Sequence, residues 1–253
     1  MWKDKFNHSE HQALIGSSFT DYSEEKSAFS FKKIVERFVS AIVCRWVHNT
    51  AEAKIRKSFP LVAESQDTAR QDGGLAGTYQ WVRLSEIAKF VKVFNVKSVC
   101  EFGSGGSTAM FSQLDLEKFI SLDQSEKWAE KTKRSLPNNA VVELLRKDRL
   151  VVDFGGEPCT RYSLPEGFYK QDFDMIYIDG PTAKVLGDEE SKLPILDKVQ
   201  QTMPNIDVEL FFSNDIFPKV ILVDARRATV RRLCENYSHK YDIFMRHYYK
   251  DRY

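Results

Sequence analysis

The chain has 253 residues, of which 42% are hydrophobic and 29% are charged, and its formal net charge is +1. These proportions indicate an ordinary globular protein, large enough for one domain and an extension. They give no electrostatic reason to expect a nucleic-acid partner, and no apolar run approaches the roughly 20 residues that span a bilayer.

The cysteines and the N-terminus indicate a reducing compartment. Cys44, Cys100, Cys159 and Cys234 are far apart in the sequence and form no C-x-x-C pair. The N-terminal residues lead into polar sequence and lack the apolar core of a signal peptide. We therefore expect a cytoplasmic protein. The five histidines have no zinc-site spacing, so no metal is expected.

Residues 1–70 are predicted to be a polar and helical extension. Within it, residues 29–47 have apolar side chains at spacings of three and four, separated by lysines and arginines. We expect this basic amphipathic helix to pack on the folded domain or on a second copy of the chain. The alternative is a peripheral contact with an anionic membrane surface.

Residues 71–253 are predicted to form an α/β domain, because strands and helices alternate there. The predicted strands are 98–102, 119–123, 141–145, 173–179, 220–224 and 241–248, with two extended pieces at 150–154 and 160–163. The predicted helices are 79–94, one starting at about 106, 125–135, part of 193–203, and 225–237. This alternation predicts a Rossmann-like, doubly wound, mostly parallel sheet that carries the N-terminal helical extension.

A glycine-rich turn follows the first predicted strand. Gly103, Gly105 and Gly106 let the backbone turn tightly and approach a ligand closely. The next helix would begin there, with its free N–H groups facing the turn. Asp123 ends the second strand, 20 residues after Gly103, where a carboxylate can accept hydrogen bonds from two ribose hydroxyls. The pattern predicts a site for a nucleoside-like cofactor.

Two residues of this turn depart from a dinucleotide motif. Thr108 stands where that motif has its third glycine, and Glu101 precedes the first glycine by two positions. A carboxylate at the position of Glu101 repels a pyrophosphate but suits an ammonium or sulfonium group.

The run E-F-G-S-G-G-S-T at residues 101–108 resembles motif I of the class I S-adenosylmethionine-dependent methyltransferases. The order of elements over about residues 71–248 is similar to that of their fold, although only one strand, 241–248, follows the last helix where that family has two. The resemblance implies S-adenosylmethionine as the cofactor and Asp123 as the residue that holds its ribose. The cofactor-binding residues that it implies are Glu101, Phe102, Gly103, Ser104, Gly105, Gly106, Ser107, Thr108, Asp123, Gln124, Asp148 and Asp179.

Each of these carboxylates has an alternative interpretation, which for Glu101 and Asp123 is helix capping or a loop hydrogen bond. Asp148 lies after the third strand, where the family often contacts adenine, but it is equally well explained as a solvated charge among basic neighbours. Asp179 could orient the methionine end of the cofactor or act as the base that takes a proton from the acceptor. Because Asp179 is followed by Gly180 and Pro181, it could also be a turn residue.

Asp224, Arg226 and Arg227 follow the fifth strand, at the expected mouth of an acceptor site. Paired arginine donors there could bind a carboxylate or phosphate, or they could form a solvated helix face. Asp179 and Asp224 could also form part of an oxygen-ligand metal site, as in the cation-dependent catechol-type methyltransferases. Those enzymes have a further acidic or amide ligand directly after the strand-five aspartate, whereas here Ala225 and Arg226 occupy that place.

The sequence therefore predicts a methyltransferase that acts on an oxygen of a small-molecule acceptor, which would be anionic or a sugar. One alternative is a Rossmann enzyme that binds NAD or a nucleotide sugar. The other is a non-catalytic protein of methyltransferase fold that serves in assembly.

Overall fold

The computed structural model describes residues 31–71, 79–134, 136, 140, 142–180, 203–223, 228–237 and 239–241. The chain divides into two compact units, residues 1–42 and 43–253, whereas the sequence suggested a division after residue 70. In the smaller unit only 31–42 is described, and it is helical. The larger unit contains the sheet.

The described residues form the following elements. The helices are α2 (Phe31–Ser58), α3 (Pro60–Gln71), α4 (Tyr79–Val93), α5 (Gly106–Phe111), α6 (Glu126–Arg134), the 3-10 helix η2 (Glu166–Lys170), α7 (Asp207–Phe212) and α8 (Ala228–Tyr237). The strands are β1 (Ser98–Phe102), β2 (Lys118–Asp123), β3 (Glu143–Arg146), β4 (Arg149–Phe154), β5 (Glu157–Tyr162), β6 (Met175–Ile178) and β7 (Val220–Val223).

The central sheet has five parallel strands in the order β3-β2-β1-β6-β7. The chain runs outward from β1 through β2 to β3, then returns to the other side of β1 to form β6 and β7. β4 and β5 form a separate antiparallel hairpin. The architecture is the predicted Rossmann-like, doubly wound α/β fold.

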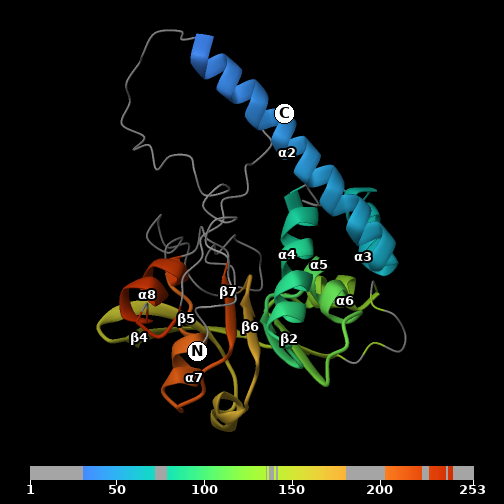
Figure 1. Ribbon diagram of the computed structural model, residues 1–253. Helices are drawn as coiled ribbons and strands as arrows, with labels where there is room; N and C mark the ends of the chain where they lie inside the picture. The colour runs from blue at the N-terminus through green and yellow to red at the C-terminus, as the bar shows by residue number, and fades with distance from the viewer. Residues whose placement is uncertain are drawn as a thin grey trace. The chain divides into compact units, whose positions relative to one another are not determined.

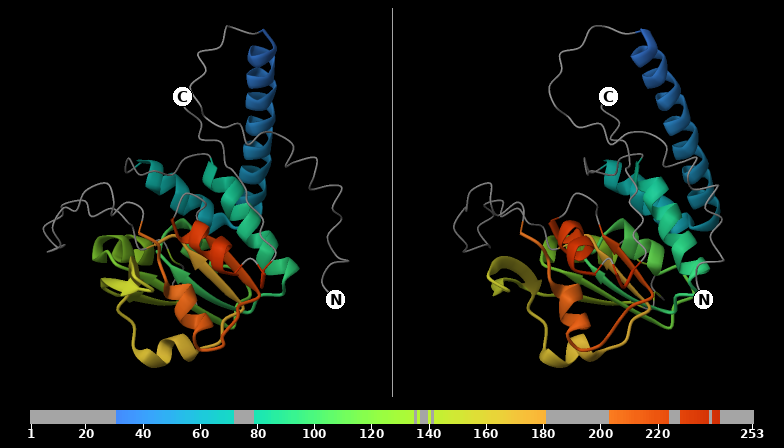
Figure 2. Two further views of the ribbon diagram at one scale, coloured as in Figure 1. Left: turned by 90° about the vertical axis from the view of Figure 1, so that its left-hand side faces the viewer. Right: turned by 60° about the vertical axis from the view of Figure 1, so that its left-hand side comes forward.

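Helices cover both faces of the sheet, because the side chains of each strand alternate between two apolar cores. The paired residues Val99, Phe119 and Met175 belong to the core shared with α3, α4 and α5. The next residue in each strand belongs to the core shared with β5, η2, α7 and α8. Figure 1 shows α4, α5 and α6 on one side of the sheet and α7 and α8 on the other, and Figure 2 shows the same layers from two further directions.

Most elements of the sheet confirm the sequence prediction, whereas the N-terminal helices differ from it. The helix expected over 29–47 continues to Ser58, because Ala51 and Ile55 supply a further buried face. α3, η2 and α7 were not anticipated. The predicted helix within 193–203 and the strand 241–248 fall almost entirely outside the described residues. Among the described helices, none is long and apolar enough to cross a membrane.

Candidate functional site

The turns that follow β1 and β6 touch backbone to backbone. The amides of Asp179 and Gly180 both donate to the carbonyl of Phe102, at 2.8 and 2.5 Å. Gly103 has a φ of +99°, and a Cβ there would lie 2.5 Å from the backbone nitrogen of Gly180. Only glycine fits such a position. β1 and β6 are also the strands between which the strand order reverses, which is where doubly wound sheets bind ligands.

Glu101, in β1 just before these touching turns, is a fully buried carboxylate. It accepts hydrogen bonds from the hydroxyls of Ser107 at 2.5 Å, Thr108 at 2.6 Å and Ser121 at 2.6 Å. Burial raises the pKa of Glu101 to about 7, although the three hydroxyl donors favour the charged form. Thr108 also accepts the amide of Gly105 at 2.8 Å. The carboxylate thus ties the first turn of α5 to β1 and β2.

The contacts of Glu101 determine which atoms of several predicted cofactor residues are left to contact a ligand. The side chains of Ser107 and Thr108 are buried and turned toward Glu101. The ring of Phe102 packs in the core on Tyr162, with 5.6 Å between ring centroids. Their contribution to a ligand would therefore come through backbone atoms, and a direct contact between Glu101 and the cofactor stays a prediction.

Asp123 lies beside the glycine turn at the end of β2. Its Oδ2 accepts both the amide of Ser104, at 2.9 Å, and the Ser104 hydroxyl, at 2.6 Å. Its Oδ1 accepts the amide of Ser125 at 2.8 Å. A carboxylate has about four acceptor positions, and these bonds use three of them. The remaining capacity is on Oδ1, so Asp123 both holds the turn and can accept a further donor.

The neighbouring Gln124 supplies a second acceptor at this edge. Its Oε1 is buried and has no hydrogen-bond partner among the described residues. A buried acceptor without a donor costs free energy, which a bound hydroxyl or amine would recover.

Asp148 differs from Gln124, because its side chain is 70% exposed and forms an ion pair with Arg146 at 3.3 Å. That geometry matches the solvated-charge interpretation, and its role toward adenine stays a prediction.

Asp179, the first residue after β6, forms an ion pair with Arg83 of α4. The Nη1 atom of Arg83 lies 3.2 Å from Oδ2 of Asp179, and both side chains are about one quarter exposed, at 25% and 28%. Two amides from the same helical region approach the other side of the turn. A Cβ on Gly106 would contact Nε2 of Gln66 and lie 3.5 Å from Oε1 of Gln80. α3 and α4 therefore bring polar groups to the glycine turn.

The sequence alone did not single out Arg83, Gln66 or Gln80. Arg83 lies in the run Trp81-Val82-Arg83-Leu84, where periodicity identifies an apolar helix face but not the target of its one charge. Gln66 lies in α3, for which no helix was predicted. Proximity to the turn is a tertiary feature that no local signal carries.

A buried polar cluster lies on the face of the sheet opposite to α5 and fixes the position of Tyr162 near the turn after β6. Asp207 accepts from the amide of Tyr162 at 3.2 Å, from the hydroxyl of Tyr169 at 2.5 Å and from the amide of Asn205 at 2.5 Å. Burial raises the pKa of Asp207 to about 6. Tyr162 is thereby fixed with its hydroxyl near Gly180, 2.7 Å from where a Cβ would stand.

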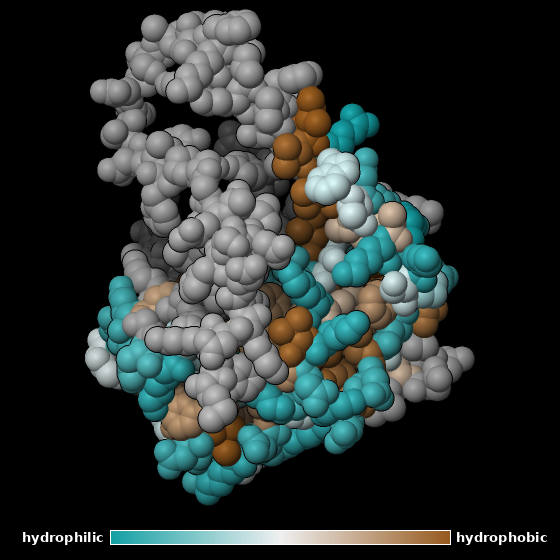
Figure 3. All heavy atoms as spheres, viewed as in Figure 1, coloured by the Kyte–Doolittle hydropathy of each residue, from teal (hydrophilic) through white to brown (hydrophobic). Residues whose placement is uncertain are grey.

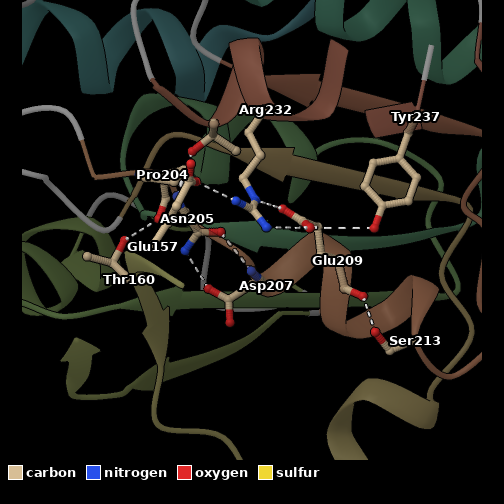
Figure 4. Close-up of polar contacts among 10 residues, drawn as sticks. Glu157, Thr160, Pro204, Asn205, Asp207, Glu209, Ser213, Arg232 and Tyr237 are labelled. Carbon is tan, nitrogen blue, oxygen red and sulfur yellow. Dashed lines mark hydrogen bonds and ion pairs between the residues drawn. The ribbon is translucent and has the colours of Figure 1, made fainter. Parts of the chain in front are cut away.

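A second part of this cluster joins α7 to α8 (Figure 4). Arg232 donates to the buried carboxylate of Glu209 at 2.5 Å and to the exposed Glu157 at 2.7 Å. Figure 4 shows the Glu209 side chain between Arg232 and Tyr237, with Asp207 and Asn205 nearby. These contacts fix α8 and the β4–β5 hairpin against α7.

The predicted acceptor residues Asp224, Arg226 and Arg227 lie outside the described residues. Within the described part of the chain, no group of three or more His, Cys, Asp or Glu side chains could hold a metal ion. The structure therefore brings together, at the carboxyl ends of β1, β2 and β6, the residues Gly103, Ser104, Asp123, Gln124 and Asp179. It adds Arg83 to them from α4.

Comparisons with solved structures find a distant similarity of fold. No protein-family model matches the chain, and no curated protein matches it. Among solved structures, the chain is similar to the S-adenosylhomocysteine-bound methyltransferase PaMTH1 of Podospora anserina, at 15% identity and a TM-score of 0.39. That match covers 79% of this chain and 73% of the other. A similarity at this level does not by itself establish a shared activity.

Proposed function

We propose that this protein is an S-adenosylmethionine-dependent methyltransferase. The observation that carries the proposal is the placement of Asp123, which is hydrogen-bonded to the Gly103–Gly106 turn at the point where the strand order reverses. A carboxylate at the tip of β2 with acceptor capacity left on Oδ1 suits a ribose hydroxyl. The buried Oε1 of Gln124 offers a second acceptor next to it.

The Arg83–Asp179 pair suits the amino-acid end of the same cofactor. That end carries an ammonium and a carboxylate on one carbon, so it needs an anion and a cation side by side. Asp179 and Arg83 supply both charges 3.2 Å apart, and Asp179 directly adjoins the glycine turn. Hydrogen bonds between these charged side chains and the charged groups of the cofactor would be roughly twice as strong as neutral ones. Glu101, with its three internal donors, is less available for this role.

Bound S-adenosylmethionine would supply a methyl group on a positively charged sulfur. The residues of the chain would bind and orient the two reactants, since alignment provides much of the rate in such a transfer. As the alternative to binding the amino-acid end of the cofactor, Asp179 is the proposed base for an acceptor hydroxyl. Asp224, Arg226 and Arg227 are proposed to bind an anionic or sugar-type acceptor, and the proposed reaction is an O-methylation.

A Rossmann enzyme that binds NAD or a nucleotide sugar is the competing function. Thr108 argues against it, because the position of the third glycine is filled by a buried side chain that donates to Glu101. A dinucleotide motif needs a glycine there for close packing of helix on strand.

Calorimetric titration of three variants with S-adenosylhomocysteine tests the proposal. Asp123→Ala should weaken binding at least tenfold, since one hydrogen bond to a charged group contributes about 1.5–3 kcal/mol. Ser104→Ala should leave the affinity unchanged, because it keeps the backbone donor and releases an acceptor position on Oδ2. Asp115→Ala is the control, because the Asp115 side chain is exposed and forms an ion pair with Lys97, away from the glycine turn.

Equal affinities of Asp123→Ala and Asp115→Ala, both folded by circular dichroism, would rule out the assigned ribose position. Asp123→Asn provides a further check, because it keeps an oxygen for the Ser104 amide while removing the negative charge. It should bind more weakly than the wild type, and its melting temperature should also fall, because its NH2 group would face the Ser125 amide that Oδ1 accepts in the wild type.

A further inference from the structure

α2 carries three large apolar side chains on its surface near the end of its first half. Trp46 is 68% exposed, Ile42 is 54% exposed and Val43 is 49% exposed. Figure 3 shows hydrophobic atoms along this part of α2. Single exposed apolar residues are common on proteins, but a contiguous group on one helix marks an interaction surface.

Ile42 and Trp46 do not belong to the face through which α2 packs on the sheet domain, whereas Val43 lies one turn before Val47 and closer to that face. That face consists of Ala51 and Ile55, which are buried, with Val47 packed beside them. Trp46 and Ile55 are nine residues apart, which at 3.6 residues per turn places them on opposite sides of the helix, about 180° apart. The domain that buries Ile55 therefore does not cover Trp46.

In the sequence, apolar residues recur at helical spacing on the N-terminal side of Ile42 as well. Phe31, Ile34, Phe38, Ile42 and Trp46 follow one another at spacings of three and four. The same stretch, 31–46, contains four basic residues, Lys32, Lys33, Arg37 and Arg45, and one acidic residue, Glu36. Its net charge of +3, in a chain whose total is +1, leaves −2 for the remaining residues. The positive charge is therefore concentrated on this half of α2.

Both features fit a surface of anionic lipid. We infer that residues 31–46 of α2 lie along an anionic membrane surface, with Ile42 and Trp46 in the boundary between headgroups and acyl chains. Basic residues of an amphipathic helix bind lipid phosphates, and aromatic residues favour this boundary. A second copy of the chain is a poorer occupant, because pairing two such segments would bring charges of +3 together.

The inference is independent of the cofactor site, so either can fail without the other. Full-length protein should sediment with vesicles of phosphatidylserine and phosphatidylcholine, and at least tenfold less with phosphatidylcholine alone. Binding should also fall in 1 M salt, where the screening length is about 3 Å instead of about 10 Å at 0.1 M.

Replacing both apolar residues in Ile42→Ser/Trp46→Ser should lower vesicle binding about tenfold or more, with no change in melting temperature, since both side chains are exposed. Val93→Ser is the matched control, because Val93 is a similarly exposed apolar residue on α4. It should bind vesicles like the wild type.

Three results would overturn the inference. The first is a wild type that stays in the supernatant with anionic vesicles. The second is a double variant that sediments as well as Val93→Ser. The third is a wild type that binds no vesicles and is a dimer by light scattering, together with a double variant that is a monomer, which would make this surface a contact between two copies.

Discussion

Replacing Gly103 by alanine tests whether the crossing of the two turns holds the site together. A Cβ at this position would lie 2.5 Å from the nitrogen of Gly180 and 2.8 Å from the carbonyl carbon of Asp179. Both atoms belong to the backbone, so no side chain can rotate away. The positive φ of +99° adds about 1–2 kcal/mol of strain, and forced overlap in a packed region adds about 1–3 kcal/mol. Gly103→Ala should therefore lower the free energy of unfolding by about 2–5 kcal/mol.

Gly105→Ala is the matched control in the same turn. Gly105 has an extended φ of 160°, and a Cβ there would meet nothing within 4 Å. Urea unfolding of both variants, followed by circular dichroism, measures the difference directly. If Gly103→Ala were as stable as Gly105→Ala, the close approach of the turns would not exist as described.

Three further predictions concern buried and paired charges. Glu101 has a pKa of about 7 in the folded chain, against an ordinary value of 4.5, so its stabilising effect is complete below pH 4.5 and is lost as the pH rises to 7. Between pH 4.5 and pH 7, the free energy of unfolding of the wild type should fall by about 3 kcal/mol more than that of Glu101→Gln. An equal fall in both proteins would refute this prediction. Arg232→Met leaves the buried carboxylate of Glu209 without its guanidinium and should cost about 3–5 kcal/mol in urea unfolding, whereas a change below about 1 kcal/mol would show that Glu209 is solvated. Arg83→Met should weaken S-adenosylhomocysteine binding at least tenfold with little loss of stability, while the exposed Arg56→Met should leave binding unchanged; equal affinities would remove Arg83 from the site.

The sheet was predictable because its strands are short apolar runs bounded by turn residues. β1 and β2 were placed within one residue of their observed ends, since Val99 and Phe119 begin continuous buried stretches that end at a glycine or an aspartate. Parallel pairing then followed from the alternation with helices. The predicted C-terminal end of α2 was wrong. Ala51 and Ile55 continue the helix with a short apolar face that is rotated away from the apolar positions of residues 29–47.

The roles of the site residues were less predictable than their positions. The E-x-G-S-G-G-S-T run located the turn, and Asp123 was placed beside it by strand order. No local pattern indicated that Glu101 would be enclosed by three hydroxyls, since Ser121 comes from a different strand. The pairing of Arg83 with Asp179 spans 96 residues and depends on how α4 packs against the sheet.

The most direct test of the central claim is calorimetric titration of the full-length chain with S-adenosylhomocysteine and, in a separate experiment, with NAD. The geometry of Asp123, Gln124 and the Arg83–Asp179 pair predicts saturable binding of S-adenosylhomocysteine in the micromolar range and none of NAD at the same concentrations. Saturable binding of NAD without binding of S-adenosylhomocysteine would contradict the methyltransferase assignment and favour a dinucleotide enzyme.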